Sequence, residues 1–282
     1  MEKDTNATGK VSAINFSDTE YFQTEHLIAT EEPLEIYIDN EPFYTTMRMP
    51  GDEIPLALGI CFTDGIIDSI EDVTGVNYCN DISRNKINVY LSPMVDKENR
   101  LKQKQRRSIA YSSCGICGTN MIENIADLTC GIKLKLVLDM SDISNMLKIM
   151  QDNQIIFPIT GGTHAAGIFS AEGELLSFSE DVGRHNALDK AIGKLLFNRN
   201  TENAGVVVLT SRLSFEMVQK TARLGAEIIC AVSSPTSLAI ELAKTVNLTL
   251  IGFLRGSRGN IYTCPERITT SFANFDTTVS SD

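Results

Sequence analysis

The first third of the chain alternates apolar and polar residues in a way that predicts a small α/β unit. Residues 34–38 and 43–47 alternate with a period of two, and Asp39-Asn40 between them offers a turn, so a hairpin is expected. An amphipathic helix is expected to start near Glu53 and to end at Gly65. Two further strands are predicted at residues 73–78 and 86–91.

The second half of the chain alternates between helical and strand patterns. Apolar residues three to four apart predict helices at residues 143–150 and 188–195, with a β-hairpin between them that turns at residues 171–173. Continuous apolar runs, typical of strands buried on both faces, follow in alternation with amphipathic helices. These strands are expected at residues 205–209, 227–232 and 248–254. The alternation predicts a largely parallel sheet between two layers of helices.

These patterns divide the chain into four parts. Residues 1–20 are polar and lack periodicity, so a flexible tail is expected there. Residues 21–110 form the predicted N-terminal α/β roll, and residues 111–130 form a loop and linker. Residues 131–282 form the three-layer α/β/α domain, and their order of helices and strands resembles the cytidine deaminase fold.

Zinc-dependent deamination does not fit the two helix starts that supply the metal ligands in that fold. At Arg184-His185-Asn186, the glutamate that should follow the histidine and act as acid and base is absent. Residues 211–214 contain no cysteine. We therefore expect a deaminase-like domain that has no zinc and keeps a crevice for a cofactor.

The charge balance of the chain excludes some partners. The formal net charge of −11 repels nucleic acid and anionic membranes, so a phosphate-bearing ligand must meet a local cluster of cations. No run of residues reaches the apolar length that spans a bilayer, and residues 1–10 are polar, so a cytoplasmic protein is expected. The basic stretch at residues 97–107 is either a solvated linker face or a docking surface.

Cysteine chemistry is concentrated in one pair. Cys114 and Cys117 form a Cys-x-x-Cys motif with Gly115 and Gly118, whereas the other cysteines are isolated and are expected to be small buried residues. Neighbouring thiols and backbone amides favour a reactive thiolate, and the glycines give the loop freedom to approach a partner. The odd total of seven cysteines does not suggest a disulfide framework.

Three chemistries compete for this pair. Structural zinc needs a second pair of ligands, which the isolated cysteines and His26, His164 and His185 do not offer. Thioredoxin-like exchange usually places the pair beside a βαβ unit, and none precedes Tyr111. The third chemistry is sulfur carriage, in which one thiolate holds sulfur as a persulfide and its neighbour shields or discharges it. The motif alone does not choose among them.

Two other segments are candidates for anion binding. The first consists of Phe253, Leu254, Arg255, Gly256, Ser257 and Arg258. It follows a predicted buried strand, so it should lie in the crevice at the carboxyl ends of the strands, where its arginines can pair with pyrophosphate and its phenylalanine can stack on a base. The second is Arg184 and His185 at a predicted helix start. The plain alternatives are a solvated basic turn and an ordinary helix cap.

Four motifs together resemble those of the FdhD family, the formate dehydrogenase accessory sulfurtransferases, in the family's own order. They are Ser-Ser-Cys114-Gly-Ile-Cys117-Gly-Thr, Thr160-Gly-Gly-Thr-His-Ala-Ala166, Glu180-Asp-Val-Gly-Arg-His-Asn-Ala-Leu-Asp-Lys190 and Gly252-Phe-Leu-Arg-Gly-Ser-Arg258. The resemblance covers roughly residues 20 to 270 and implies a sulfur carrier.

The resemblance also implies particular roles. Cys114 would carry the persulfide, with Cys117 as helper or second acceptor. Sulfur would come from a cysteine desulfurase and pass to Mo-bis(molybdopterin guanine dinucleotide), whose guanine nucleotide arms lie near residues 253–258, before the cofactor enters formate dehydrogenase. A homodimer without a structural metal is expected. The alternatives are a chaperone that holds the molybdenum cofactor without transferring sulfur, and a thiol–disulfide redox protein.

Overall fold

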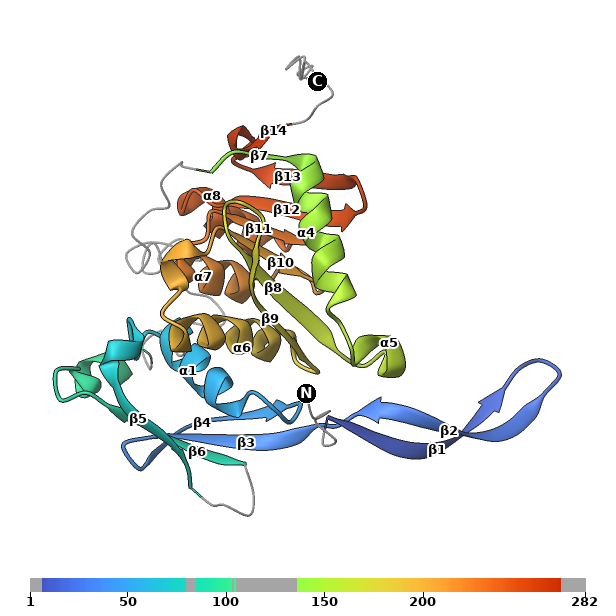
Figure 1. Cartoon of the computed structure of the whole chain (residues 1–282), viewed down its shortest axis with the longest axis horizontal. Coiled ribbons are helices and arrows are strands. Elements are labelled where there is room, and N and C mark those ends of the chain that lie inside the picture. The colour runs from blue at the N-terminus through green and yellow to red at the C-terminus, as the bar shows by residue number, and fades with distance from the viewer. Residues whose placement is uncertain (1–6, 80–84, 103, 105–135, 270–282) are drawn as a thin grey trace.

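The computed structural model describes residues 7–79, 85–102, 104 and 136–269, and it is an α/β protein built on two main sheets (Figure 1). The α/β class predicted from the sequence is confirmed. In the described part of the chain, no helix is both long enough and apolar enough to cross a bilayer.

A β-hairpin projects from the body at the start of the described chain (Figure 1). Strands β1 (Thr8–Phe16) and β2 (Tyr21–Ala29) pair antiparallel along their whole lengths. The flexible tail expected at residues 1–20 is therefore wrong for residues 8–16. Most side chains on this ribbon are exposed, so neither strand carries the buried face that produces a period of two in sequence.

The N-terminal sheet has four strands in the order β4-β3-β6-β5, with α1 packed on one face. The predicted hairpin and both later strands are confirmed, and Asp39 and Asn40 take the positive φ values of a tight turn. The bounds of these elements are β3 Glu32–Ile38, β4 Glu41–Arg48, α1 Glu53–Thr63, β5 Val73–Tyr78 and β6 Lys86–Leu91.

The C-terminal sheet has six strands in the order β13-β12-β11-β10-β8-β9. Only β10, β11 and β12 are mutually parallel, because β8 and β13 pair antiparallel with their neighbours. The strands are β8 His164–Phe169, β9 Leu175–Asp181, β10 Val206–Leu209, β11 Ile228–Ala231, β12 Thr249–Arg255 and β13 Arg258–Thr263. Short strands β7 (Leu138–Asp139) and β14 (Ile268–Thr269) pair separately.

Helices cover both faces of the six-stranded sheet, which gives the expected three layers (Figure 1). One face is covered by α4, and the other by α6, α7 and α8. Their bounds are α4 Met140–Asp152, α6 Arg184–Phe197, α7 Phe215–Leu224 and α8 Ser237–Thr245, and a single turn, α5, spans Phe157–Thr160. The likeness to cytidine deaminases stays a prediction.

The two sheets share one hydrophobic core. A single cluster of buried apolar side chains runs from Leu34 and Ile36 in the N-terminal sheet, through α1 and α6, to Leu250 in β12. A smaller cluster lies under α4 on the opposite face of the six-stranded sheet. Because α1 and α6 lie between the sheets, the N-terminal unit packs directly on the helical layer of the C-terminal unit (Figure 1).

Two glycines allow α1 and α6 to approach this closely. A Cβ atom added at Gly193 in α6 would overlap the carbonyl oxygen of Pro55 in α1. A Cβ atom at Gly59 in α1 would overlap the carbonyl oxygen of Asp189 in α6. Each helix therefore offers a glycine to the backbone of the other, and any side chain there forces the two units apart.

We expect Gly193→Ala to destabilise the protein, although alanine normally favours a helix by about 0.5–1 kcal/mol over glycine. Overpacking of a rigid backbone contact costs about 1–3 kcal/mol, which exceeds that gain. The midpoint of urea unfolding should fall. Gly9→Ala is the matched control, because nothing lies within 4 Å of a Cβ at that position. An unchanged or higher midpoint for Gly193→Ala would contradict the close approach.

Candidate functional site

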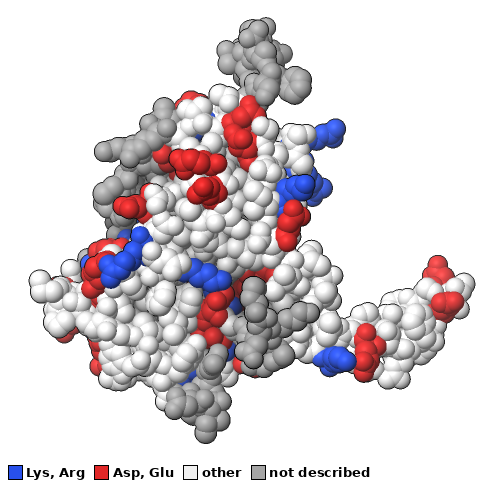
Figure 2. Space-filling view, viewed as in Figure 1, with Lys and Arg blue, Asp and Glu red and all other residues white. Residues whose placement is uncertain are grey.

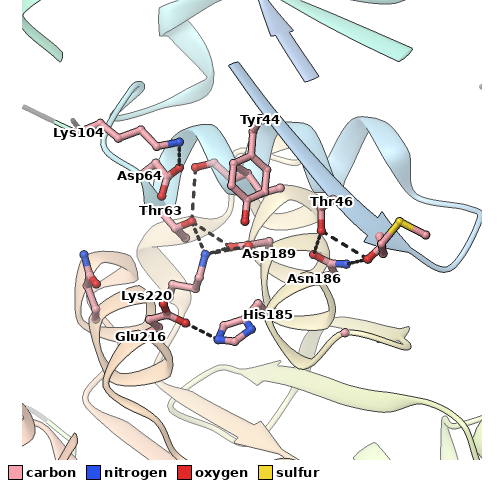
Figure 3. A pocket seen from close by; sticks show the side chains of 14 residues that line it. Tyr44, Thr46, Thr63, Asp64, Lys104, His185, Asn186, Asp189, Glu216 and Lys220 are labelled. Atoms are coloured by element: carbon pink, nitrogen blue, oxygen red, sulfur yellow. Dashed lines mark hydrogen bonds and ion pairs between the residues drawn. The ribbon is translucent and has the colours of Figure 1, made fainter. Parts of the chain in front are cut away.

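A cavity of about 490 Å³ opens where the N-terminal unit meets helices α6 and α7, and we call it the junction cavity (Figure 3). Strand β4 contributes Tyr44 and Thr46, α1 contributes Thr63, and Asp64 follows directly after α1. The remaining wall comes from Lys104, α6 and α7. The cavity has the size and the mixed polar lining of small-molecule sites in other proteins.

A buried ion pair forms one wall of the junction cavity. Lys220 Nζ in α7 lies 2.8 Å from both carboxylate oxygens of Asp189 in α6, and it also donates to Thr63 Oγ1 at 2.9 Å. Burial has the largest single effect on the pKa of Lys220 and lowers it, but the Asp189 and Asp64 carboxylates together outweigh burial and raise that pKa. The lysine is therefore a fixed cation that joins α1, α6 and α7.

A second pair lies beside the first, one helical turn away between α6 and α7. His185 Nε2, in the first turn of α6, lies 2.5 Å from a carboxylate oxygen of Glu216 in α7 (Figure 3). The hydrogen bond from His185 is the main cause of the lowered pKa of Glu216. An imidazole that is oriented by a carboxylate can exchange a proton with a ligand bound beside it.

The start of α6 is held in place by Asp181 at the end of β9. Its Oδ1 accepts hydrogen bonds from the backbone N–H of Gly183 at 2.9 Å and from Asn186 Nδ2 at 3.1 Å. Asn186 also donates to the Met47 carbonyl and accepts from Thr46 Oγ1. These bonds fix the turn from which His185 enters the cavity.

The arrangement is suited to acid–base chemistry on a polar ligand. Tyr44, Lys220 and the His185–Glu216 pair offer donors of different acidity around one space, and burial raises the pKa of Tyr44 so that its hydroxyl stays protonated. Among the described residues, no group of three or more His, Cys, Asp or Glu side chains can hold a metal ion.

The predicted segment Phe253–Arg258 follows a buried strand, as expected, and it forms the turn of a hairpin; its role in binding stays a prediction. Strand β12 runs on past the sheet edge as far as Arg255 and returns as β13 from Arg258, so the segment is the tip of a protruding hairpin. The strand β13 was missed because its glycine, arginine and asparagine residues give little strand signal.

Within this hairpin, the predicted site residues have different surroundings. Leu254 is fully buried against α4, so it is a core residue. The side chains of Arg255, Gly256, Ser257 and Arg258 are exposed. Phe253 is 44% exposed, has a positive φ of 54°, and donates its backbone N–H to the Ser233 carbonyl. Lys and Arg side chains gather at this end of the molecule, next to acidic ones (Figure 2).

The structure does not bring the two predicted anion-binding segments together. His185 lines the junction cavity, whereas no residue of the hairpin tip does. Arg184 lies at the start of α6 near His164 in β8, and the pKa of that histidine is lowered by burial first and by the charge of Arg184 second. Cys114 and Cys117 lie outside the described residues. The described residue nearest before them in sequence, Lys104, lines the junction cavity and pairs with Asp64 at 2.5 Å.

Sequence patterns missed most of the junction cavity. Asp189 lies in a motif whose arginine and histidine suggest anion binding, but nothing in the motif points to the aspartate. Its neighbour in the cavity, Lys220, lies on a helix that the sequence marks only by an apolar face. Tyr44 and Glu216 carry no signal in the sequence. They become neighbours only because α1 packs across α6.

The sequence model of the FdhD/NarQ family matches residues 29–269. A curated relative from Sulfurisphaera tokodaii, called sulfur carrier protein FdhD, is 41% identical over 86% of this chain and 92% of its own. One of the same name from Saccharolobus solfataricus is 39% identical over 90% of this chain and 96% of its own.

One solved structure is similar along almost the whole chain. It is the crystal structure of a protein from Desulfotalea psychrophila that is named as a candidate formate dehydrogenase accessory protein. It has a TM-score of 0.75 and 26% sequence identity, and the match covers 93% of this chain and all of the other.

The His185–Glu216 pair predicts a pH dependence of stability. The pKa of Glu216 is lowered in the folded state from its ordinary value of 4.5, so the pair contributes stability above pH 4.5 and loses it as the pH falls below 4.5. Glu216 is half-exposed, so the contribution is at most about 1 kcal/mol.

We expect Glu216→Gln to lose less stability than the wild type between pH 5 and pH 3.5, measured by urea unfolding at each pH. Glu241→Gln, at an exposed glutamate of α8, is the control and should follow the wild type. Equal losses in Glu216→Gln and the wild type would show that the histidine does not stabilise the carboxylate.

Proposed function

Because the chain belongs to the FdhD/NarQ family, we propose that it is a sulfur carrier that serves the maturation of formate dehydrogenase. In this proposal, Cys114 accepts sulfur from a cysteine desulfurase as a persulfide and passes it to Mo-bis(molybdopterin guanine dinucleotide). The observation that carries the proposal is the family match over residues 29–269, which includes both Cys114 and Cys117.

The described cysteines support this assignment, because most of them are poor nucleophiles. Cys61 and Cys230 are fully buried, and burial raises the pKa of both thiols, that of Cys230 to about 12. The pKa of Cys264 is also raised. Among the described cysteines, Cys79 alone is exposed, and it has no second cysteine near it in sequence. A thiolate is the reactive form, so the Cys114 pair is the better candidate.

The transfer can be written as two exchange steps. In the first, the Cys114 thiolate attacks the terminal sulfur of the desulfurase persulfide, and the desulfurase thiolate leaves without net oxidation. In the second, the Cys117 thiolate attacks Sγ of Cys114. A Cys114–Cys117 disulfide forms, and the carried sulfur leaves as sulfide with the two electrons that the thiols have lost. A dithiol reductant then restores the pair.

The acceptor accounts for the cations at the hairpin tip. The molybdenum cofactor is the substrate here, and each of its guanine nucleotide arms carries a pyrophosphate. Arg255 and Arg258 are exposed and lie opposite each other in the register of β12 and β13, so both can reach one pyrophosphate. Arg184 and His185 are the second proposed contact, at the start of α6.

The remaining partners follow from the family. We propose that formate dehydrogenase receives the sulfurated cofactor, that the carrier works in the cytoplasm as a homodimer, and that it needs no structural metal. Neither nucleic acid nor a membrane surface is a partner in this proposal, because the net charge of −11 disfavours both.

Sulfur loading is tested by incubating the full chain with a cysteine desulfurase and labelled cysteine, followed by intact mass measurement. The wild type should gain one labelled sulfur, and Cys114→Ala should gain none. Cys79→Ala is the control, because it removes an exposed cysteine outside the motif. Label that persists in Cys114→Ala, or a wild type that never gains label, would exclude the carrier and favour a chaperone or redox role.

Cofactor binding at the hairpin tip is tested with guanosine diphosphate. We expect Arg255→Ala together with Arg258→Ala to weaken binding by at least tenfold, since each charged hydrogen bond contributes about 1.5–3 kcal/mol. The difference in affinity between the double variant and the wild type should be smaller at high salt. Arg199→Ala, at an exposed arginine that follows α6, is the control. Equal affinity of the double variant and the wild type in calorimetry would show that the hairpin tip does not bind the nucleotide.

A further inference from the structure

Exposed apolar side chains gather on the hairpin formed by β1 and β2, which we call the arm. In the described part of the chain, sixteen large apolar side chains are exposed, and seven of these lie on the two strands of the arm. Phe16 and Tyr21 are 84% and 76% exposed, and they lie opposite each other at the tip. Soluble proteins seldom leave an apolar surface of this extent uncovered unless it is an interaction site.

The arm has little support from the rest of the molecule. Among the described strands, β1 and β2 pair only with each other, and most of their side chains are exposed. A two-stranded hairpin without a covered face is marginally stable at best in water. Its outer edges also expose backbone groups that can pair with another chain. The arm therefore needs a cover whenever the protein is folded, and a second copy of the chain is the partner that is always present.

The two ends of the arm carry opposite charges. Lys10 lies near the base, and the turn at the tip contains Asp18 and Glu20. Figure 2 shows acidic side chains at the tip and a basic one nearer the base. Lys10 lies 3.9 Å from Glu25 of its own arm, but both side chains are 75% exposed, so the lysine can meet a second carboxylate.

These charges favour one arrangement of two arms. Antiparallel arms place the lysine of each copy beside the acidic tip of the other, whereas parallel arms place like charges together. An antiparallel pair related by a two-fold axis uses the same surface of both copies, as a symmetric dimer requires. The arm is therefore complementary to a second arm that runs in the opposite direction.

The base of the arm lies beside a second group of exposed apolar side chains. A Cβ atom added at Gly162, which follows α5, would lie 3.4 Å from the Cβ atom of Ala29 at the end of β2, so α5 adjoins the base (Figure 1). Ile155, Phe157 and Ile159, in and just before α5, are exposed. A strand of this length extends about 30 Å, so antiparallel arms bring each tip to the base of the other. The aromatic tip of one copy can therefore reach the apolar surface around α5 of the other.

We propose that two copies of the chain associate through the arm. The arms lie antiparallel about a two-fold axis, with Phe16 and Tyr21 of each copy against the apolar surface around α5 of the other. Each acidic tip then lies beside Lys10 of the other copy. This inference rests on the proposed function, which includes a homodimer, and it assigns the contact surface. The FdhD/NarQ family model begins at residue 29, where the arm ends, so we expect the association to be separable from sulfur carriage.

The apolar contact is tested by measuring the dimer dissociation constant of the full chain by analytical ultracentrifugation. The wild type should form dimers. Phe16→Ser together with Tyr21→Ser should raise the dissociation constant at least tenfold, because aromatic anchors dominate such contacts. Both side chains lie outside the hydrophobic core, so the body should stay folded, which urea unfolding verifies. Phe197→Ser, at the exposed last residue of α6, is the matched control and should leave the constant unchanged.

The antiparallel arrangement is tested by exchanging charges between the two ends of the arm. Lys10→Glu should weaken the dimer several-fold, and adding Asp18→Lys and Glu20→Lys to that variant should restore it. Within one arm, Lys10 and the tip are about 20 Å apart along the strand, which is beyond the range of such a contact. Restoration can therefore come only from contacts between two copies.

A monomeric wild type, or an unchanged dissociation constant in the variant that lacks Phe16 and Tyr21, would overturn the inference. Failure of the exchanged charges to restore dimers would overturn the antiparallel arrangement. Sulfur loading of Cys114 is measured on the same variants and should be normal. Normal loading by a wild type that never dimerises would refute the arm alone, whereas arm-dependent dimers of a wild type that gains no sulfur would refute the carrier alone.

Discussion

The structure depends on the buried pair formed by Asp181 and Lys190, whose side chains are 0% and 1% exposed and lie 2.7 Å apart. Together they enclose the backbone of Met49, whose N–H donates to the aspartate and whose carbonyl accepts from the lysine. The pair thus joins the end of β9, the middle of α6 and the chain that leads into α1. Removing one partner of such a pair costs about 3–5 kcal/mol, a large fraction of the stability of a typical domain.

The contact between the two units is specific because polar and apolar constraints coincide there. Gly59 and Gly193 let the backbones of α1 and α6 touch, and Lys220 joins Asp189 to Thr63 across the same seam. The close approach of the backbones sets the distance between α1 and α6, and the ionic contacts fix how the helices align along their length. The junction cavity lies beside this contact, where residues of β4 and α7 complete its lining.

Sequence patterns predicted elements that bury a regular face and missed those that do not. The runs at 205–209 and 227–232 became β10 and β11 because strands buried on both faces must be apolar throughout. The β1–β2 ribbon buries neither face, so no periodicity revealed it.

The sites followed the same rule. His185 could be placed at a helix start because that is a local signal, and Arg255 and Arg258 could be singled out by their charge, although their place in a hairpin could not. Two sets of contacts depend on which strands and helices become neighbours. One is the set of hydrogen bonds that Glu180 accepts from the backbone of residues 155–157, and the other is the pairing of His185 with Glu216. A motif can mark such residues, as the one that begins at Glu180 does, without indicating what they touch.

Glu180 and Asp181 are consecutive residues of β9, so their side chains leave the strand on opposite faces. Glu180 holds the backbone of the α5 turn, and Asp181 holds the start of α6 beside the junction cavity. The α5 turn and the start of α6 are therefore positioned by two consecutive residues of one strand. An inserted or deleted residue in β9 exchanges the faces and removes both supports at once, so this strand tolerates changes of side chain far better than changes of length.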